Sequence, residues 1–341
     1  FQAEDGIRDP LWSRGLGDVY KRQVVFYGTP AEETIFGKVW FARAGLFNDL
    51  DVCLDWHPGD DMEAATQSSK ALIDFRVKFS GKTAHASADP YNGFSAVDGM
   101  ELFTTGINYY REHIKPTARI HYQIEKAGDV VNVVPDKAQI WVRVRENDRE
   151  SLNVVYERVK KMAAAGALMA EVEHKIELIS GIYEILPNRR GAVAIQSNFE
   201  MLGPIKYTKK EMAYAKEIQR ATGKPEIGMD GAIHSLKETM PAQGGSTDVG
   251  DVSQLVPVVR LSTPAAPKDA PWHSWAVVAC TGMSIGHKGM IQATKALGMT
   301  MVDLFENPQL VKEVKAEFKD CLLYTSPSPR DQRGSRLPAC G

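Results

Sequence analysis

The chain has 341 residues, of which 43% are hydrophobic and 25% charged, and its formal net charge is -2 at pH 7. This length favours two domains, and a charge near zero argues against binding to nucleic acid or an anionic membrane, which needs a basic excess. The sequence has no apolar run of the roughly 18 residues that span a membrane, and its four cysteines have no regular spacing, which excludes a disulfide scaffold and an all-cysteine zinc site.

The two ends of the chain differ in character from its middle. Codons that can encode residues 18–23 are the reverse complement of codons for residues 321–326, which unrelated termini would rarely show. We therefore expect residues 1–23 and 321–341 to be translated adapter sequence, with native disordered tails as the alternative. Native sequence then covers 24–320, and its true start is missing. Nothing in its cysteines indicates an oxidising compartment, so we expect a cytoplasmic protein, although the sequence is silent on a signal peptide.

The first native segment, 24–67, predicts alternating strands and helices. A strand-like run at 24–26 precedes a turn at 28–30, a helix over 31–44 and a second strand at 52–54. Residues 71–181 follow a different pattern, in which Ile73, Phe75, Val77 and Phe79 alternate with polar residues as in a half-buried strand. Strands near 120, 140 and 175 and helices at 93–110 and 149–169 complete the order β-α-β-β-α-β, which is that of a ferredoxin-like module.

The α/β pattern returns after residue 183. Helices are predicted near 189–202 and 208–222, followed by a glycine-rich loop at 244–250, a strand at 256–261 and helices after residue 273. The simplest organisation is an α/β domain formed by 24–67 and 183–320, interrupted by an inserted ferredoxin-like α+β domain at 68–182.

Three side chains form a candidate metal site. Glu33 follows Glu32 at a strand-to-helix junction, where one carboxylate can bind a metal while its neighbour carries a proton. His57 lies at the end of a predicted strand, where open α/β sheets place ligands, and His273 lies between two tryptophans before a helix. Together Glu33, His57 and His273 suit Zn²⁺ or Mn²⁺. Taken singly, they also fit an ordinary helix start, a surface histidine and a capping or packing residue.

Three further features lie in loops. His85 follows the first inserted strand, and taken alone it is an inert loop histidine. Asn132 is by default a turn residue. The glycine-rich segment at 244–251 has no lysine after its glycines, so it is not a phosphate-binding loop, and its glycines favour close approach of the backbone to a site.

In this order, the motifs resemble the M20 family of metallopeptidases and amidohydrolases. The resemblance covers 24–320 and rests on Gly-Thr-Pro-Ala-Glu-Glu at 28–33, the histidine at 57, Gly-Lys-Thr-Ala-His at 81–85, Asn-Val-Val-Pro-Asp at 132–136 and His-Ser at 273–274. Within the family, residues 246–253 and 273–290 are most similar to the branch that cleaves p-aminobenzoyl-glutamate into p-aminobenzoate and glutamate. The implied fold is a mixed-sheet metallohydrolase domain carrying an inserted ferredoxin-like lid and dimerisation domain.

The resemblance implies a metal-dependent amidohydrolase that cleaves a small amide of the N-acyl amino acid type. Glu32 would be the general base that activates a metal-bound water, and Glu33, His57 and His273 would bind the divalent metal, Mn²⁺ or Zn²⁺. A homodimer through residues 68–182 is expected, with a heterodimer with a related subunit as the alternative; neither nucleic acid nor a membrane is an expected partner.

The resemblance also assigns roles to the inserted domain. His85 would help to hold the oxyanion of the reaction, often in the partner subunit's site, and Asn132 would bind a polar or carboxylate group of the substrate.

The sequence departs from the family before the Glu-Glu motif. Family members carry further ligands of a two-metal centre there, and residues 1–23 contain neither histidine nor cysteine. We therefore expect an incomplete metal site and an inactive or nearly inactive polypeptide. Two other hypotheses remain open: a non-catalytic, lid-bearing subunit that dimerises with a complete paralogue, and a module that binds a small molecule in the same cleft without hydrolysis.

Overall fold

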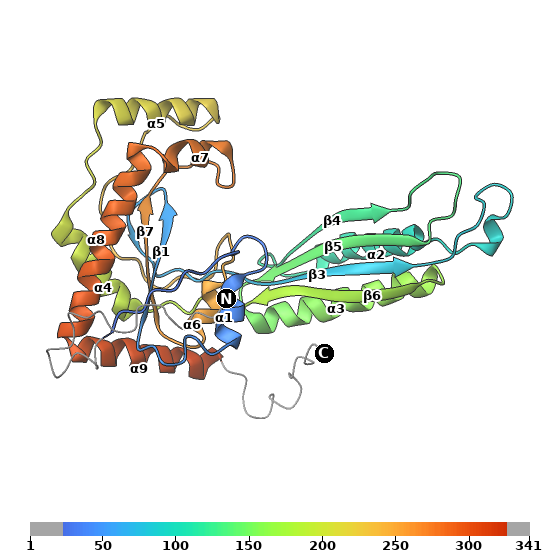
Figure 1. The fold of residues 1–341 in the computed structure, drawn as a ribbon, viewed down its shortest axis with the longest axis horizontal. Helices are drawn as coiled ribbons and strands as arrows, with labels where there is room; N and C mark the ends of the chain where they lie inside the picture. The colour runs from blue at the N-terminus through green and yellow to red at the C-terminus, as the bar shows by residue number, and fades with distance from the viewer. Residues whose placement is uncertain (1–22, 326–341) are drawn as a thin grey trace.

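The computed structural model describes residues 23–325. Most of both predicted adapter tails, 1–22 and 326–341, therefore lies outside the described residues. The chain forms an α/β domain and an elongated insert that extends from one side of it (Figure 1). None of the described helices is both long and apolar enough to cross a bilayer.

The α/β domain is built on a three-stranded sheet in the order β1-β7-β2. Strand β7 (Val258–Pro264) pairs in parallel with β1 (Cys53–Gly59) and antiparallel with the short β2 (Glu63–Ala64). The helices of this domain are α1 (Gly37–Arg43), α4 (Arg189–Leu202), α5 (Lys209–Ala221), α6 (Val249–Ser253), α7 (Trp275–Thr281), α8 (Ser284–Glu306) and α9 (Pro308–Thr325), and α4 and α8 pack directly on the sheet. Segments from both ends of the described chain thus share one domain.

The insert is a four-stranded antiparallel sheet covered on one face by two helices. Its elements are β3 (Ala71–Ser80), α2 (Ala96–Tyr110), β4 (Arg119–Ala127), β5 (Lys137–Glu146), α3 (Arg149–Met169) and β6 (Glu173–Ile182). The strand order β4-β5-β3-β6 is that of a ferredoxin-like fold, which confirms the predicted fold class. Helix α3 begins at 149 because Asp148 accepts a hydrogen bond from the N–H of Ser151 and caps the helix.

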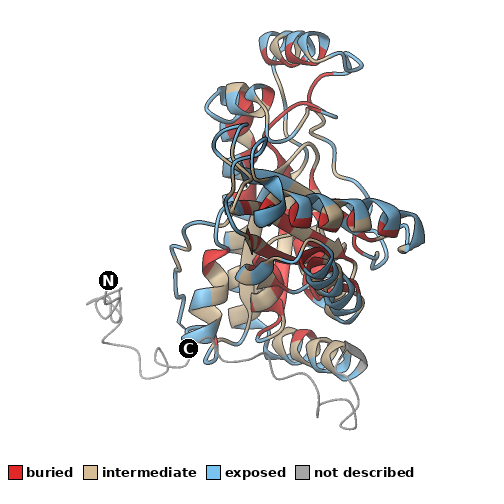
Figure 2. Ribbon diagram, turned by 90° about the vertical axis from the view of Figure 1, so that its right-hand side faces the viewer, coloured by how far each residue is buried: buried red, intermediate tan, exposed pale blue. Residues whose placement is uncertain are grey.

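The core of the insert lies between its sheet and its helices. Alternate strand residues such as Phe75 and Ile140 are completely buried against Phe103 of α2 and Leu152 of α3. Figure 2 shows the same division across the molecule, with buried residues on the strands and on the inner sides of helices. The opposite face of the insert sheet is polar, as the period of two in the sequence predicts.

At the start of the α/β domain, the structure differs from the strand and the helix that the sequence predicts. Residues 24–26 form no strand and are at least half exposed, since no strand of the described chain pairs with them. The predicted helix over 31–44 begins only at Gly37, because Ala31 (φ 64°) and Phe36 (φ 56°) adopt left-handed conformations that interrupt a helix.

The two connections between the domains lie side by side. Ser68 Oγ donates to the carbonyl of Ile185 at 2.6 Å, and the N–H of Ile185 donates to Ser69 Oγ at 3.2 Å. These bonds pair the segment that leads into the insert with the segment that leaves it.

Candidate active site

The acidic pair lies in a turn before α1. Glu33 is exposed, whereas Glu32 is half-buried and its carboxylate is hydrogen-bonded to the side chain of Thr247. Burial raises the pKa of Glu32, and the negative charges of Asp248 and Glu33 raise it further, against the opposing effects of the Thr247 bond and Lys38. A half-buried carboxylate with a raised pKa suits a proton carrier.

A buried ion pair anchors this turn. Both carboxylate oxygens of Asp248 bind Lys38, one through the backbone N–H and one through Nζ, each at 2.9 Å. Asp248 has no exposed surface, so its charge depends on this partner. The pair links α1 to the start of α6.

His57 and His273 lie near the carboxyl ends of the parallel strands, His57 within β1 and His273 in the segment that follows β7. The Nδ1 of His57 donates to the carbonyl of Pro58 at 2.7 Å, which leaves Nε2 as an acceptor, as in many metal-binding histidines. The ring of Trp272 lies 6.2 Å from that of His57, centroid to centroid. His273 is exposed and has a strained backbone with a φ of 59°.

The described residues do not fit a metal centre. Within residues 23–325, no three histidine, cysteine, aspartate or glutamate side chains are close enough together to hold an ion. The contact between His57 and Trp272 brings the two histidine segments together, whereas Glu33 belongs to the turn anchored on α6. Metal binding by Glu33, His57 and His273 therefore stays a prediction.

His85 and Asn132 are brought together in adjacent loops. His85 pairs with Val133 in an isolated β-bridge, and the N–H of Ala86 donates to the carbonyl of Asn132 at 3.0 Å. Both side chains are exposed. Their loops lie at the end of the insert farthest from β1 and β7 (Figure 1). Within one chain they are therefore remote from the other candidate residues.

The imidazole of His85 is oriented by the backbone of its own loop. Its Nδ1 accepts hydrogen bonds from the N–H groups of Ser87 at 3.2 Å and Ala88 at 3.0 Å. Neutral His85 must therefore carry its proton on Nε2, where it can donate a hydrogen bond to an oxyanion.

A cluster of basic residues on the polar face of the insert sheet was not predicted from the sequence. Arg119 lies opposite Arg145, and His121 opposite Arg143, on neighbouring strands β4 and β5. Burial lowers the pKa of His121, and the charges of these arginines and of Arg111 lower it further. The alternation of polar residues in each strand was visible in the sequence, but the register that places like charges opposite one another was not.

The basic cluster lies beside α1. The guanidinium of Arg143 is 5.9 Å from the ring centre of Phe36, the residue just before this helix, and it also donates to Asp74 at 2.6 Å. Arg145 Nε is buried and has no hydrogen-bond partner among the described residues. This guanidinium nitrogen is therefore a hydrogen-bond donor that no described residue satisfies.

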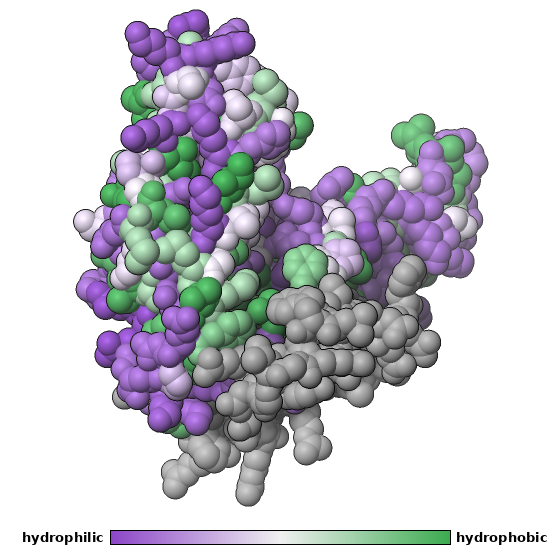
Figure 3. All heavy atoms as spheres, turned by 60° about the vertical axis from the view of Figure 1, so that its left-hand side comes forward, coloured by the Kyte–Doolittle hydropathy of each residue, from purple (hydrophilic) through white to green (hydrophobic). Residues whose placement is uncertain are grey.

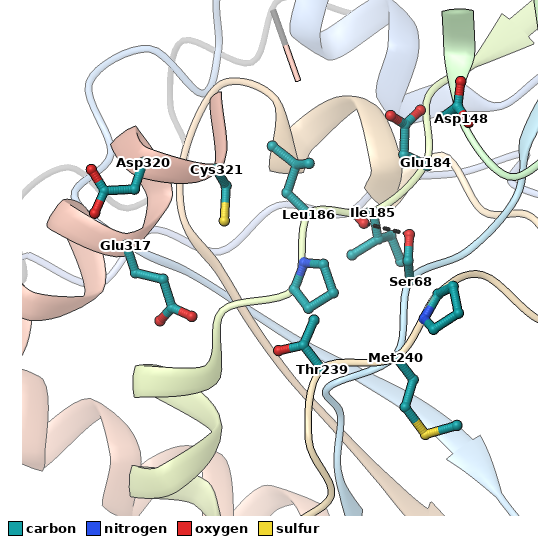
Figure 4. A pocket seen from close by; sticks show the side chains of 12 residues that line it. Ser68, Asp148, Glu184, Ile185, Leu186, Thr239, Met240, Glu317, Asp320 and Cys321 are labelled. Carbon is teal, nitrogen blue, oxygen red and sulfur yellow. Dashed lines mark hydrogen bonds between the residues drawn. The ribbon is translucent and has the colours of Figure 1, made fainter. Parts of the chain in front are cut away.

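Two hollows mark the junction of the domains. The space-filling view shows an open cleft between the α/β domain and the insert (Figure 3). A separate cavity of about 520 Å³ lies beside the paired connections, between Ser68, Met240 and Glu317 (Figure 4). None of the six predicted site residues lines this cavity.

Comparison with known proteins identifies the family. Residues 67–169 match the peptidase dimerisation domain of the M20 family. Over 99% of its length the chain is 33% identical to one of the subunits of the p-aminobenzoyl-glutamate hydrolase of Escherichia coli, and it covers 75% of that protein. Over 87% of its length it is 29% identical to Xaa-Arg dipeptidase of Mus musculus, of which it covers 62%.

A solved structure shows the same fold. The aminobenzoyl-glutamate utilization protein of Klebsiella pneumoniae superimposes with a TM-score of 0.52 at 18% identity, over 81% of this chain and 60% of that one. The chain thus spans three quarters of the Escherichia coli relative and less than two thirds of the other two proteins. It belongs to the M20 family of peptidases and amidohydrolases, which are hydrolases that act on amide bonds.

Proposed function

We propose that the protein hydrolyses the amide bond between an acyl group and an acidic amino acid, with p-aminobenzoyl-glutamate as its substrate. The observation that carries this proposal is the basic cluster formed by Arg119, His121, Arg143 and Arg145. The name of the Escherichia coli relative, which is part of a p-aminobenzoyl-glutamate hydrolase, supports the same substrate.

The charges of the cluster favour an anionic substrate. Like charges directly opposite on neighbouring strands destabilise a sheet, so a bound anion would relieve their repulsion. Asp74 neutralises only part of this positive charge, because its two oxygens accept hydrogen bonds from Arg143 and from the indole N–H of Trp141. The guanidinium of Arg145, whose buried Nε lacks an acceptor among the described residues, would bind a substrate carboxylate, with which guanidinium groups form strong paired hydrogen bonds.

Glu32 is our proposed general base. The hydrogen bond to Thr247 positions its carboxylate. Its raised pKa makes this carboxylate a better acceptor for a proton from water, which it would then pass to the leaving amine. Its turn lies close to the basic cluster, since Phe36 contacts Arg143. A substrate carboxylate held by the cluster would therefore place the scissile amide on the same side of the insert as Glu32.

A divalent metal, Mn²⁺ or Zn²⁺, belongs to this proposal through the family, and when bound it would supply polarisation of the amide carbonyl. The described residues do not assemble its site, so we assign no step to it.

Dimer formation gives His85 and Asn132 a role. The insert is a peptidase dimerisation domain, and its outer strands β4 and β6 each have a single partner within the described chain. We propose that two chains associate through the insert. The loops at its far end would then bring the Nε2–H of His85 to the reacting carbonyl and Asn132 to the substrate in the other subunit's site.

Release of p-aminobenzoate from p-aminobenzoyl-glutamate, with Mn²⁺ or Zn²⁺ added, tests this proposal against the sequence-based expectation of an inactive polypeptide. We expect Arg145→Gln to raise KM roughly ten-fold or more, since a hydrogen bond to a charged group contributes about 1.5–3 kcal/mol. Arg76→Gln is the matched control, because Arg76 lies on the same sheet face but is bound to Glu125 through two nitrogens at 2.8 and 2.9 Å. Its KM should stay unchanged.

Two outcomes would contradict the proposal. Equal turnover of an amide that lacks both carboxylates would remove the role of the basic cluster. Turnover only when a related complete subunit is added, and unaffected by Glu32→Gln, would instead support the non-catalytic partner.

A further inference from the structure

The short helix α6 is joined on one side to the turn that carries Glu32. Asp248, which precedes α6, binds the backbone N–H and the Nζ of Lys38. The preceding residue, Thr247, is hydrogen-bonded to Glu32. A movement of α6 would therefore displace both Lys38 and the Glu32 turn.

The other side of α6 holds residues 183–186, through which the chain leaves the insert. Three hydrogen bonds connect the two segments, and they are Tyr183 N–H to Asp251 Oδ2 at 3.1 Å, Leu186 N–H to Ser253 Oγ at 2.9 Å, and Gln254 Nε2 to the carbonyl of Glu184 at 3.0 Å. This segment cannot shift without breaking these bonds or moving α6.

The contact is also sterically close. A Cβ added at Gly250 would lie 1.9 Å from the carbonyl oxygen of Tyr183, so the two backbones touch directly. Val249, Val252 and Ser253 are buried, which leaves this five-residue helix little room to deform. We therefore expect α6 to move as a unit.

We propose that α6 couples the orientation of the insert to the position of Glu32, with Asp251 and Asp248 as positioning residues on its two sides. Rotation of the insert about residues 183–186 moves α6, and α6 carries Lys38 and the Glu32 turn with it. The catalytic consequence rests on the proposed function: substrate contacts made on the insert then align the general base. The coupling itself does not require turnover.

Hydrogen exchange of single backbone amides tests the coupling directly. The N–H of Tyr183 reports on the insert side of α6, and the N–H of Lys38 reports on the Glu32 side. Asp251→Ala removes the acceptor of Tyr183. We expect exchange at Lys38 to accelerate roughly five-fold, the effect of losing about one hydrogen bond, although Lys38 does not bind residue 251.

The conservative variant separates positioning from a general loss of stability. Asp251→Asn keeps an oxygen facing the Tyr183 N–H and should restore slow exchange at Lys38. Ser253→Ala, which removes the bond to Leu186, should accelerate exchange at Lys38 as well, and it replaces Asp251→Ala if that variant fails to fold. The matched control is Lys268→Met, which breaks an ion pair with Asp61 outside α6 and should leave Lys38 unchanged.

The outcomes distinguish the coupling from the proposed function. Faster exchange at Tyr183 or Leu186 with wild-type exchange at Lys38 would overturn the coupling. Equal acceleration in Lys268→Met would also overturn it, because the response would then be global. A wild-type protein that lacks amidase activity but shows the Lys38 response would refute the proposed function and leave the coupling intact.

Discussion

The imidazole of His57 lies beside the indole of Trp272, with ring centroids 6.2 Å apart and ring planes tilted by 53°. Because His273 follows Trp272, this contact brings the segments of two predicted metal ligands to one edge of the sheet. The third predicted ligand, Glu33, lies in a turn whose position is set by the bond between Lys38 and Asp248. Two structural units thus have to approach each other before the predicted ligands could share an ion.

We expect neutral His57 and neutral His85 to be opposite tautomers. His57 donates through Nδ1 to a carbonyl, whereas Nδ1 of His85 accepts from two backbone N–H groups. Long-range nitrogen–proton NMR correlations should therefore place the proton of His57 on Nδ1 and that of His85 on Nε2. The same tautomer at both residues would contradict these hydrogen bonds.

Lys38→Met should destabilise the protein strongly. The substitution leaves the carboxylate of Asp248 buried without its cation, and breaking a buried pair in this way costs about 3–5 kcal/mol. Urea unfolding measures the loss. The matched control is Lys78→Met, whose ion pair with Glu177 is solvent-exposed and contributes about 0–1 kcal/mol. Similar losses in the two variants would show that Asp248 does not depend on Lys38.

Asp251 should make stability depend on pH. Burial raises its pKa from 3.8 to about 7, so between these values the folded state keeps a proton that the unfolded state has released. The contribution of this group to the free energy of unfolding is therefore greatest below pH 4 and falls as the pH rises towards 7. Above pH 7 it stays at its lowest value. Relative to wild type, Asp251→Asn should therefore gain stability across this interval, by up to a few kcal/mol, since one pKa unit corresponds to about 1.4 kcal/mol.

Urea unfolding of wild type and Asp251→Asn at pH 5 and pH 8 measures this difference. The neighbouring charges of Arg149 and Asp248 are present in both proteins and cancel in the comparison. A difference between the two proteins that does not change with pH would show that Asp251 keeps its ordinary pKa.

Gly289→Ala should separate α8 from β7. A Cβ at this position would lie 2.2 Å from the carbonyl oxygen of Pro264, and overpacking of this kind costs about 1–3 kcal/mol. Gly282→Ala is the matched control, because a Cβ there meets nothing within 4 Å. We expect it to be neutral or to stabilise by about 0.4–1 kcal/mol through the unfolded chain. Thermal unfolding of both variants provides the test.

The insert could be predicted from the sequence because its signals are local. From Ile73 onward strand β3 alternates apolar and polar residues, and α3 has a capping aspartate followed by a regular apolar stripe, so the predicted helix at 149–169 matches the structure. The strand predicted at 24–26 was wrong because its formation depends on a non-local interaction. An apolar run predicts a strand only when a neighbour pairs with it, and pairing is a property of the folded chain.

The candidate site was harder to predict from the sequence, because it depends on unusual backbone conformations and on the register in which strands pair. The left-handed conformations of Ala31 and Phe36 place Glu32 and Glu33 outside the helix, and neither residue type signals such a conformation. The basic cluster arises because strand pairing places Arg119 of β4 opposite Arg145 of β5, and the sequence does not specify this pairing. The anchoring aspartate, Asp248, is distant in sequence from the lysine it binds.

The side-by-side connections at Ser68 and Ile185 make the insert a detachable module (Figure 4). A short loop joining residue 68 to residue 185 would close the gap left by removing the insert, and an unrelated domain with adjacent termini could be grafted at the same place. Such chimaeras would keep the α/β scaffold while exchanging the domain through which we propose that two chains associate.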